Sequence, residues 1–399
     1  MNSKLPDVGT SVFTRMTLLA QETGALNLAQ GFPDYDPPRA LREALARHAL
    51  APGGHQYAAM PGLPRLRAAI AAQVGRLRPG APAPDPDAEI TVTAGATEAL
   101  YAVLAAVVRP GDEVLVLEPA YDLYGPAIRL QGGVPRYVRL PAPDFRPDWD
   151  AVRAAFSART RLVLVNSPHN PSGAVFSAAD WDALAALVDG TDALVLSDEV
   201  YEHLVFDGAP ARSARQHPGL RGRSFVLSSF GKTYHATGWK VGYCVAPPAL
   251  TRELRRVHQF VTFSVSTPTQ LALADTLEAD PADAHARGLA GFYQAKRDLF
   301  RGLLAGAGWD LLPVPAGYFQ LAGYAALSGA PDGAFAEELA RRWGVAVVPV
   351  SAFYHDGHDP GLVRFCFAKE APTLEAAAER LRAGTHKLFT PKIGPAAAG

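Results

Sequence analysis

Short apolar runs alternate with longer helical stretches through the middle of the chain. A run that is apolar at nearly every position indicates a strand buried on both faces, as in parallel sheets covered by helices. The predicted strands are Glu89–Thr93, Glu113–Leu117, Arg161–Asn166, Ala193–Ser197, Ser224–Ser228 and Val241–Ala246. A helix is predicted over Ala96–Arg109. We therefore predict an α/β fold whose large domain has a mostly parallel central sheet flanked by helices.

The pattern changes after about residue 280. A long helical stretch, Ala282–Ala305, leads into shorter strand-like pieces and a final helix, Thr373–Arg382. The strand-like pieces are Tyr318–Ala322, Val345–Val350 and Leu362–Phe367. This mixture predicts a second, smaller α+β domain. We place the large domain at residues 46–285 and the small domain at 1–45 and 286–399, with 390–399 as a tail without a function of its own.

Composition narrows the range of partners. The chain has 399 residues, and 38 Lys and Arg against 39 Asp and Glu leave a formal net charge of −1, so no global field attracts nucleic acid. Two cysteines, Cys244 and Cys366, are too few for a disulfide framework and favour a reducing compartment. The apolar run Ala99–Val108 is half the ~20 residues of a membrane span, and Met1–Gln21 lacks signal-peptide features. We expect a cytoplasmic protein that binds neither nucleic acid nor membranes.

The ends of the predicted strands carry the candidate chemistry, because ligands of such sheets bind where strands end and loops begin. The first strand runs into Gly95 at the start of a helix, where free N–H groups and the helix dipole suit a phosphate. The strand that ends at Asn166 runs into a rigid turn, and the next strand runs into Asp198. Taken singly, these features are also ordinary turn and helix-cap signals.

The position of Lys232 suggests a single function for these strand-end features. Lys232 stands in an apolar, glycine-containing loop after the strand Ser224–Ser228, whereas lysines normally lie on solvated faces. A lysine kept out of water has a lowered pKa and acts as an amine nucleophile, as in the Schiff base with pyridoxal phosphate. That cofactor also needs a phosphate cradle, an acid at its pyridine nitrogen and a donor to its phenolate oxygen. The strand ends offer Gly95–Thr97, Asp198, and Asn170 with Tyr201.

Three motifs resemble those of the fold-type I, class I/II pyridoxal-phosphate-dependent aminotransferases: NSPHNPSG (Asn166–Gly173), SDEVY (Ser197–Tyr201) and SSFGKTYHATGWKVG (Ser228–Gly242). Three shorter ones fit the same family: QGFP (Gln30–Pro33), YAAMPG (Tyr57–Gly62) and VRFCF (Val363–Phe367). The resemblance runs from about Thr10 to about Thr385, with the motifs in the family's order. Within the family it is nearest to the group of bacterial methionine aminotransferases and kynurenine aminotransferases, also called glutamine transaminase K.

The resemblance implies an activity and a residue set. Lys232 would form the internal aldimine with pyridoxal 5′-phosphate and shuttle a proton, in a ping-pong transfer of the amino group of a methionine-like or aromatic amino acid to a 2-oxo acid. The residues implied to bind the cofactor are Gly95, Ala96, Thr97, Tyr121, Asn170, Asp198, Tyr201, Ser229, Lys240 and Tyr57. Those implied to bind the substrate are Gly31, Asn170, Arg364, Phe13, Phe32 and Phe263.

The implied roles differ between the residues. Asp198 would pair with the pyridine N–H, Asn170 and Tyr201 would bind the phenolate oxygen, and Tyr121 would stack on the ring. Lys240, where the family often has arginine, would hold the phosphate with Ser229 and the N–H groups of Gly95–Thr97. Tyr57 would reach the phosphate from the neighbouring subunit, which implies a homodimer with shared active sites. Arg364 would grip the substrate α-carboxylate with two parallel hydrogen bonds.

The resemblance also places an aromatic lining around the substrate side chain, from Phe13, Phe32, Tyr57, Tyr121 and Phe263. An apolar pocket of this kind favours methionine and aromatic amino acids, with kynurenine and glutamine as further candidates. We find no second arginine in a motif position comparable to Arg364, which an enzyme dedicated to dicarboxylates would need.

Two alternatives remain open. A cysteine-S-conjugate or C–S β-lyase uses the same cofactor and scaffold, and a non-catalytic ligand sensor could use the fold alone. We expect no metal: the loop His355–Asp359 carries metal-type side chains but stands without a further ligand cluster. His169 and His235 are expected to have structural roles, and Glu199 and Glu202 are expected to be solvated or locally hydrogen-bonded.

Overall fold

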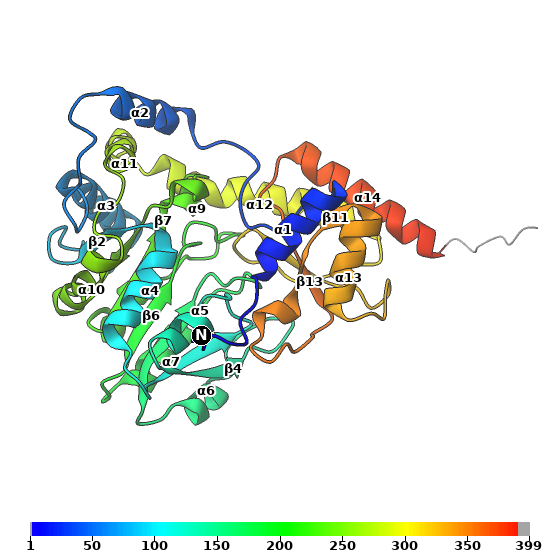
Figure 1. Cartoon of the computed structure of the whole chain (residues 1–399), viewed down its shortest axis with the longest axis horizontal. Helices are drawn as coiled ribbons and strands as arrows, with labels where there is room; N and C mark the ends of the chain where they lie inside the picture. The colour runs from blue at the N-terminus through cyan, green and yellow to red at the C-terminus, as the bar shows by residue number, and fades with distance from the viewer. Residues whose placement is uncertain (1, 390–399) are drawn as a thin grey trace, which may run out of the picture. The chain divides into compact units, whose positions relative to one another are not determined.

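Seven strands form the main sheet, in the order β2-β8-β7-β6-β5-β3-β4 (Figure 1). Their bounds are β2 Ile90–Thr93, β3 Glu113–Glu118, β4 Val134–Arg139, β5 Thr160–Asn166, β6 Leu194–Asp198, β7 Ser224–Ser229 and β8 Gly242–Val245. Within this sheet only β8 is antiparallel to its neighbours. The prediction of a mostly parallel sheet is confirmed, and the six predicted strands match to within two residues at each end.

The edge strand β4 is the strand that the hydrophobic pattern does not indicate. Its side chains alternate between exposed and partly buried positions, and Val138 is its one buried residue. The strand also contains Pro135, which cannot donate a ladder hydrogen bond and is tolerated because an edge strand leaves one side unpaired. A one-sided strand with a proline lacks the continuous apolar run that identifies its neighbours.

The structure describes residues 2–389, and these form two units. The large unit is Tyr35–Gln294 with two short pieces, 2–8 and Pro315–Gly317. Beside the sheet it contains the helices α2 Arg39–Leu50, α3 Pro64–Leu77, α4 Gly95–Val107, α5 Tyr124–Leu130, α6 Trp149–Ala155, α7 Ala178–Val188, α8 Pro218–Arg221, α9 Phe230–Thr233, α10 Pro248–Val261 and α11 Thr267–Ala279. The short 3₁₀ turns η1 Ala214–Gln216 and η2 Thr237–Trp239 complete it.

The small unit is Gly9–Asp34, Ala295–Val314 and residues 318–389. An antiparallel sheet of order β12-β13-β10-β9 lies within it, and β1 pairs with β11 in parallel. The bounds are β1 Leu26–Asn27, β9 Asp310–Leu311, β10 Phe319–Gly323, β11 Val345–Ala346, β12 Val348–Pro349 and β13 Leu362–Cys366. Its helical segments are α1 Val12–Thr23, α13 Asp332–Glu338, η3 Leu339–Trp343, η4 Val350–Phe353 and α14 Ala371–Phe389. Helix α12, Ala284–Leu304, crosses the unit boundary, and the predicted tail 390–399 lies outside the described residues.

The unit boundaries fall at 34/35 and 294/295, whereas the sequence places them at 45/46 and 285/286. The difference at the first boundary arises because α2 packs against α11, beside which it lies in Figure 1, and so joins the large unit. Apolar residues of the two helices, among them Leu41, Ala44 and Leu273, share one core. None of the described helices has the length and apolar character needed to cross a membrane.

Candidate active site

The carboxyl ends of β2, β3, β5, β6 and β7 meet at one edge of the sheet because these strands run in the same direction. The cofactor residues expected in the large unit follow these ends, apart from Tyr57 and Lys240. Lys240 lies two residues before the antiparallel strand β8, so it comes to the same edge. The topology therefore brings together residues that lie up to about 150 positions apart in the sequence.

The start of α4 forms the candidate phosphate cradle. Gly95 has φ +77°, and the N-cap residue Ala94 has no polar side chain to bond the N–H groups of the first turn. A Cβ built on Gly95 would stand 3.4 Å from the Nζ atom of Lys240, which places that ammonium group at the helix start. Gly242 permits the close approach of β8, because a Cβ there would lie 2.9 Å from the Ala96 nitrogen. Uncapped N–H groups, a helix dipole and an ammonium group together suit a phosphate dianion.

Asp198 is buried at the end of β6. The Tyr124 hydroxyl donates a 2.7 Å hydrogen bond to its Oδ2 atom, and the Val200 N–H donates to Oδ1 over 3.3 Å. Burial raises the pKa of Asp198, and these two donors together with the positive charge of Lys232 oppose that rise. A buried carboxyl of this kind gains most from a cationic partner, such as a protonated pyridine nitrogen. Sequence reasoning missed Tyr124, the first residue of α5, because its partner Asp198 lies 74 positions further along the chain.

The NSPHNPSG turn is bound to the turn that carries Asp198. The Asn166 side-chain amide donates to the Asp198 carbonyl oxygen over 2.8 Å, and its Oδ1 accepts from the Asn170 N–H over 2.7 Å. Asn170 therefore has a fixed backbone position beside Asp198. His169 is buried, its Nδ1 lies 2.7 Å from the Ser172 hydroxyl, and burial lowers its pKa to about 4. A neutral histidine inside a turn has the structural role that the sequence suggests.

Lys232 lies on α9, directly after β7, and is partly buried. Its Nζ atom stands 5.8 Å from the centroid of the Tyr201 ring. Ser229 precedes α9, and its Oγ atom would lie 3.4 Å from a Cβ built on Gly231. Tyr121 packs edge-to-face on Tyr124 at 5.7 Å between ring centroids. Lys232 and Tyr124 interact with Asp198 itself, and Tyr121 and Tyr201 lie close enough to act on Tyr124.

Arg364 lies in the small unit, on β13, and is 1% exposed. The rings of Phe319, Phe353 and Phe13 have their centroids 3.9, 5.1 and 5.2 Å from its guanidinium carbon. Its Nη2 atom donates to the Ala29 carbonyl over 2.9 Å. Gly31 packs on the same Phe319 ring, since a Cβ there would lie 2.9 Å from the ring. The flat faces of the guanidinium group thus pack against aromatic rings.

The remaining predicted residues are surface groups of their units. Phe32 is partly exposed, with the Lys369 Nζ atom 4.8 Å from its ring centroid. Tyr57 and Phe263 are 82% and 51% exposed and contact each other edge-to-face, with 5.2 Å between their ring centroids. Large aromatic side chains exposed as a pair are typical of surfaces that another chain covers.

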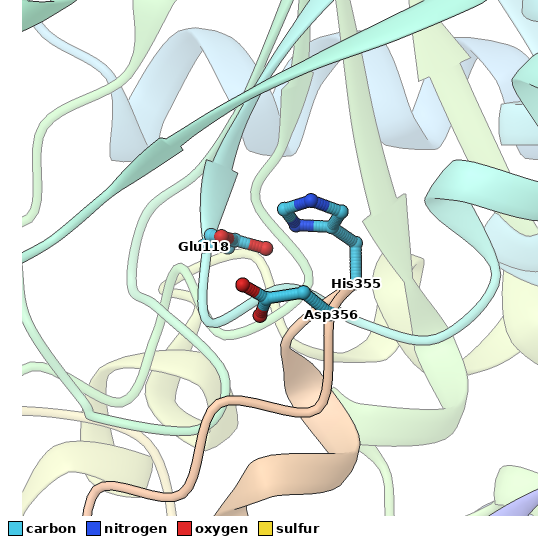
Figure 2. A group of neighbouring side chains, drawn as sticks. All are labelled: Glu118, His355 and Asp356. Carbon is cyan, nitrogen blue, oxygen red and sulfur yellow. The ribbon is translucent and has the colours of Figure 1, made fainter.

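Figure 2 shows Glu118, which ends β3, together with His355 and Asp356, which follow η4. Glu118 is buried and lies 3.5 Å from the Arg139 guanidinium group. The first residue belongs to the large unit and the other two to the small unit, and we assign no metal site to them.

Glu199 and Glu202 are not solvated as one of the expectations had it. Glu199 is 1% exposed, and its Oε1 atom accepts from the Ser197 hydroxyl and the Ala214 N–H over 2.8 and 2.9 Å. Burial raises the pKa of Glu199 to about 7. Glu202 is buried too, and its partner Arg78 stands 124 residues away in the sequence. The expected local hydrogen bond is present at Glu199, whose partner Ser197 is two residues away. The expectation of solvation is wrong for both residues, because protein partners replace water.

The pKa of Glu199 predicts a pH effect on stability. Between the ordinary value of 4.5 and about 7 the folded state keeps a proton that the unfolded state has lost, so the free energy of unfolding falls as pH rises. Glu199→Gln cannot ionise and should gain on the order of 3 kcal/mol over wild type between about pH 5 and about pH 8. Urea unfolding of both proteins at the two pH values measures this; a difference that stays constant with pH would contradict it.

Comparison with known proteins shows the family of the chain. The family description "Aminotransferase class I and II" matches residues 23–381. Methionine aminotransferase of Escherichia coli is 51% identical over 95% of this chain and 97% of its own, and the crystal structure of that enzyme, YbdL, superposes with a TM-score of 0.92 over 96% and 99% of the two chains. N-succinyldiaminopimelate aminotransferase of Mycobacterium tuberculosis is 38% identical with a TM-score of 0.91 over 96% and 100%. Kynurenine–oxoglutarate transaminase of Dictyostelium discoideum is 34% identical over 94% of each chain.

The chain belongs to the class I and II aminotransferase family and has the fold-type I architecture. It is a pyridoxal-phosphate-dependent transaminase that acts on amino acids and 2-oxo acids. The residues of the large unit fit the cofactor: an uncapped helix start beside an ammonium group suits its phosphate, and a buried carboxyl suits its ring nitrogen.

Proposed function

We propose that this enzyme moves the amino group of methionine-like or aromatic amino acids to a 2-oxo acid, as a cytoplasmic homodimer that shares its active sites. The observation that carries the amino-acid and 2-oxo-acid part of the proposal is the setting of Arg364, a buried guanidinium group suited to a substrate α-carboxylate. The similarity to E. coli methionine aminotransferase over nearly the whole chain supports the same substrate class.

Each residue has a separate task in the proposal. Lys232 would hold the cofactor at rest, and as a free amine it would take the proton from the substrate Cα and deliver it to the cofactor carbon that carried the aldehyde. Asp198 keeps a proton on the pyridine nitrogen by its negative charge, with Tyr124 fixing the carboxyl group. Asn170 and Tyr201 donate to the phenolate oxygen. The bound cofactor supplies the electron sink that makes the Cα proton acidic.

The phosphate group is proposed to lie at the start of α4. The N–H groups of Gly95, Ala96 and Thr97, the Ser229 hydroxyl and the Lys240 ammonium would hold it, with Tyr121 against the ring. Tyr57 and Phe263 would act on the partner's site. Their exposure, together with that of Phe260 at 86%, supports a dimer interface on this surface. Sedimentation of the holoenzyme at twice the chain mass is expected, and a single-chain mass would contradict the shared site.

Substrate preference tests the proposed function directly. The specificity constants for methionine and phenylalanine should exceed that for aspartate by at least about 10²-fold, because a distal carboxylate would enter an aromatic lining without a cationic partner. The specificity constants for kynurenine and glutamine should lie between those for methionine and aspartate. Steady-state comparison with one common 2-oxo acid provides the measurement. A specificity constant highest for aspartate would overturn the apolar pocket.

Replacing Arg364 should affect binding of both substrates. Arg364→Ala removes a two-point carboxylate clamp and should lower the specificity constants for methionine and the 2-oxo acid by about 10²-fold, mainly through KM. The exposed Arg342→Ala, from the same unit, serves as the control and should behave as wild type. Unchanged saturation by both substrates would remove Arg364 from the site.

A further inference from the structure

Two buried glutamate side chains stand among the proposed cofactor residues in the segment 198–202. Asp198 and Tyr201 are proposed to hold the cofactor, and Glu199 and Glu202 stand in the same five residues. Backbone hydrogen bonds shape the turn: the Glu202 N–H donates to the Glu199 carbonyl over 2.9 Å, and the Glu199 N–H donates to Leu227 of β7 over 3.0 Å. The position of Tyr201 therefore depends on what anchors its neighbour Glu202.

Three elements converge on the Glu202 carboxylate. The Arg78 guanidinium group, at the end of α3, donates to its Oε2 atom, and the Ser228 hydroxyl on β7 donates to its Oε1 atom. The Tyr243 hydroxyl on β8 lies 3.5 Å from the same Oε1 atom. The other charged or titratable neighbours are His203, with Nε2 at 3.7 Å, and Glu199, which interacts electrostatically with Glu202 and with Arg78.

The arrangement is a costly way to stabilise a fold. Arg78 and Glu202 are both buried, so each loses its hydration, and apolar side chains of similar volume often serve stability as well. Three donors from three elements bind this carboxylate, however. Each hydrogen bond restricts the distance and angle of the carboxylate, so its position is fixed relative to all three elements. The pair thus fixes the turn to the strand that also carries Ser229, one residue beyond Ser228.

We propose that Glu202 and Arg78 are positioning residues of the cofactor site. They fix the 198–202 segment so that the Tyr201 hydroxyl lies at the phenolate oxygen of the cofactor and the Asp198 carboxylate lies at its pyridine nitrogen. The inference rests on the proposed roles of Tyr201 and Asp198. A hydroxyl that donates to the phenolate oxygen favours its ionised form, so a displaced Tyr201 must move the absorbance titration of the bound cofactor to higher pH.

The test compares the pH titration of cofactor absorbance in four purified holoenzymes. Tyr201→Phe gives the full effect of losing the hydroxyl. Glu202→Gln keeps the shape but removes the charge, and its titration midpoint should move in the same direction by a smaller amount, with kcat reduced about tenfold. Asp283→Asn is the matched control, since Asp283 is a fully buried carboxylate paired with Arg76 over 2.8 and 2.9 Å. It should lose stability and keep the wild-type titration and kcat.

Three outcomes decide the proposal. A Glu202→Gln titration that coincides with wild type, with a loss of stability like that of Asp283→Asn, overturns it and leaves a structural ion pair. If Glu202→Gln fails to fold, Ser228→Ala removes one donor only and should still shift the midpoint upward; no shift overturns the inference. If the wild-type protein binds no cofactor, or if the absorbance of its bound cofactor does not change with pH, the proposed function itself is overturned, and the inference with it.

Discussion

Lys232→Ala is expected to abolish transamination while the protein still folds. The variant loses both the amine that bonds to the cofactor and the base that moves the Cα proton, so the rate should fall by at least about 10⁴-fold. Lys232 stands on a four-residue helix with its Nζ atom 5.8 Å from the Tyr201 ring centroid, and truncation there leaves the sheet intact. Turnover of methionine by the purified variant, with circular dichroism as the check on folding, measures the effect.

A second lysine provides the control. Lys296, partly buried in α12, hydrogen-bonds the Lys369 carbonyl over 2.7 Å, and Lys296→Ala should keep the wild-type rate. Borohydride reduction of the wild-type holoenzyme should attach the cofactor to Lys232 alone. Wild-type transamination by Lys232→Ala, or reduction at another lysine, would show that the assignment is wrong.

Asp198→Asn should still bind the cofactor but lose at least about 10²-fold in kcat. An amide has no charge to keep the pyridine nitrogen protonated, and the loss falls on the step at Cα rather than on binding. Tyr124→Phe leaves the carboxylate in place without its 2.7 Å hydrogen bond and should cause a smaller loss. Asp283→Asn is again the control: it removes a buried carboxylate outside the site and should leave kcat unchanged. A kcat for Asp198→Asn close to wild type would contradict the role.

Local sequence signals identified the strands that position the site. The runs RLVLVN and SFVLS lie in β5 and β7, which are buried along nearly all of their length because valine, leucine and phenylalanine fill both faces. The residues that follow such strands are readable from the sequence, and Gly95, Asp198 and Lys232 come at strand ends as expected. The parallel topology then brings these ends to one edge.

Contacts between distant residues could not be predicted in this way. Tyr124 and Asp198 are 74 positions apart, and nothing near Tyr124 in the sequence announces a carboxylate partner. From the sequence, Arg78 and Glu202 would each be expected on a solvated surface, but in the structure both are buried and form an ion pair. The same limit explains the boundary of the large unit, since the packing of α2 on α11 joins segments more than 200 residues apart.

The central claim, a methionine-type aminotransferase, is tested most directly by one half-reaction. Purified holoenzyme is mixed with methionine in the absence of any 2-oxo acid, and the cofactor spectrum and the products are followed. The account predicts loss of the resting absorbance together with one equivalent of the 2-oxo acid of methionine per active site, and recovery of the spectrum when a fresh 2-oxo acid is added. Continuous release of ammonia and a thiol without any added 2-oxo acid would contradict the account and identify a lyase.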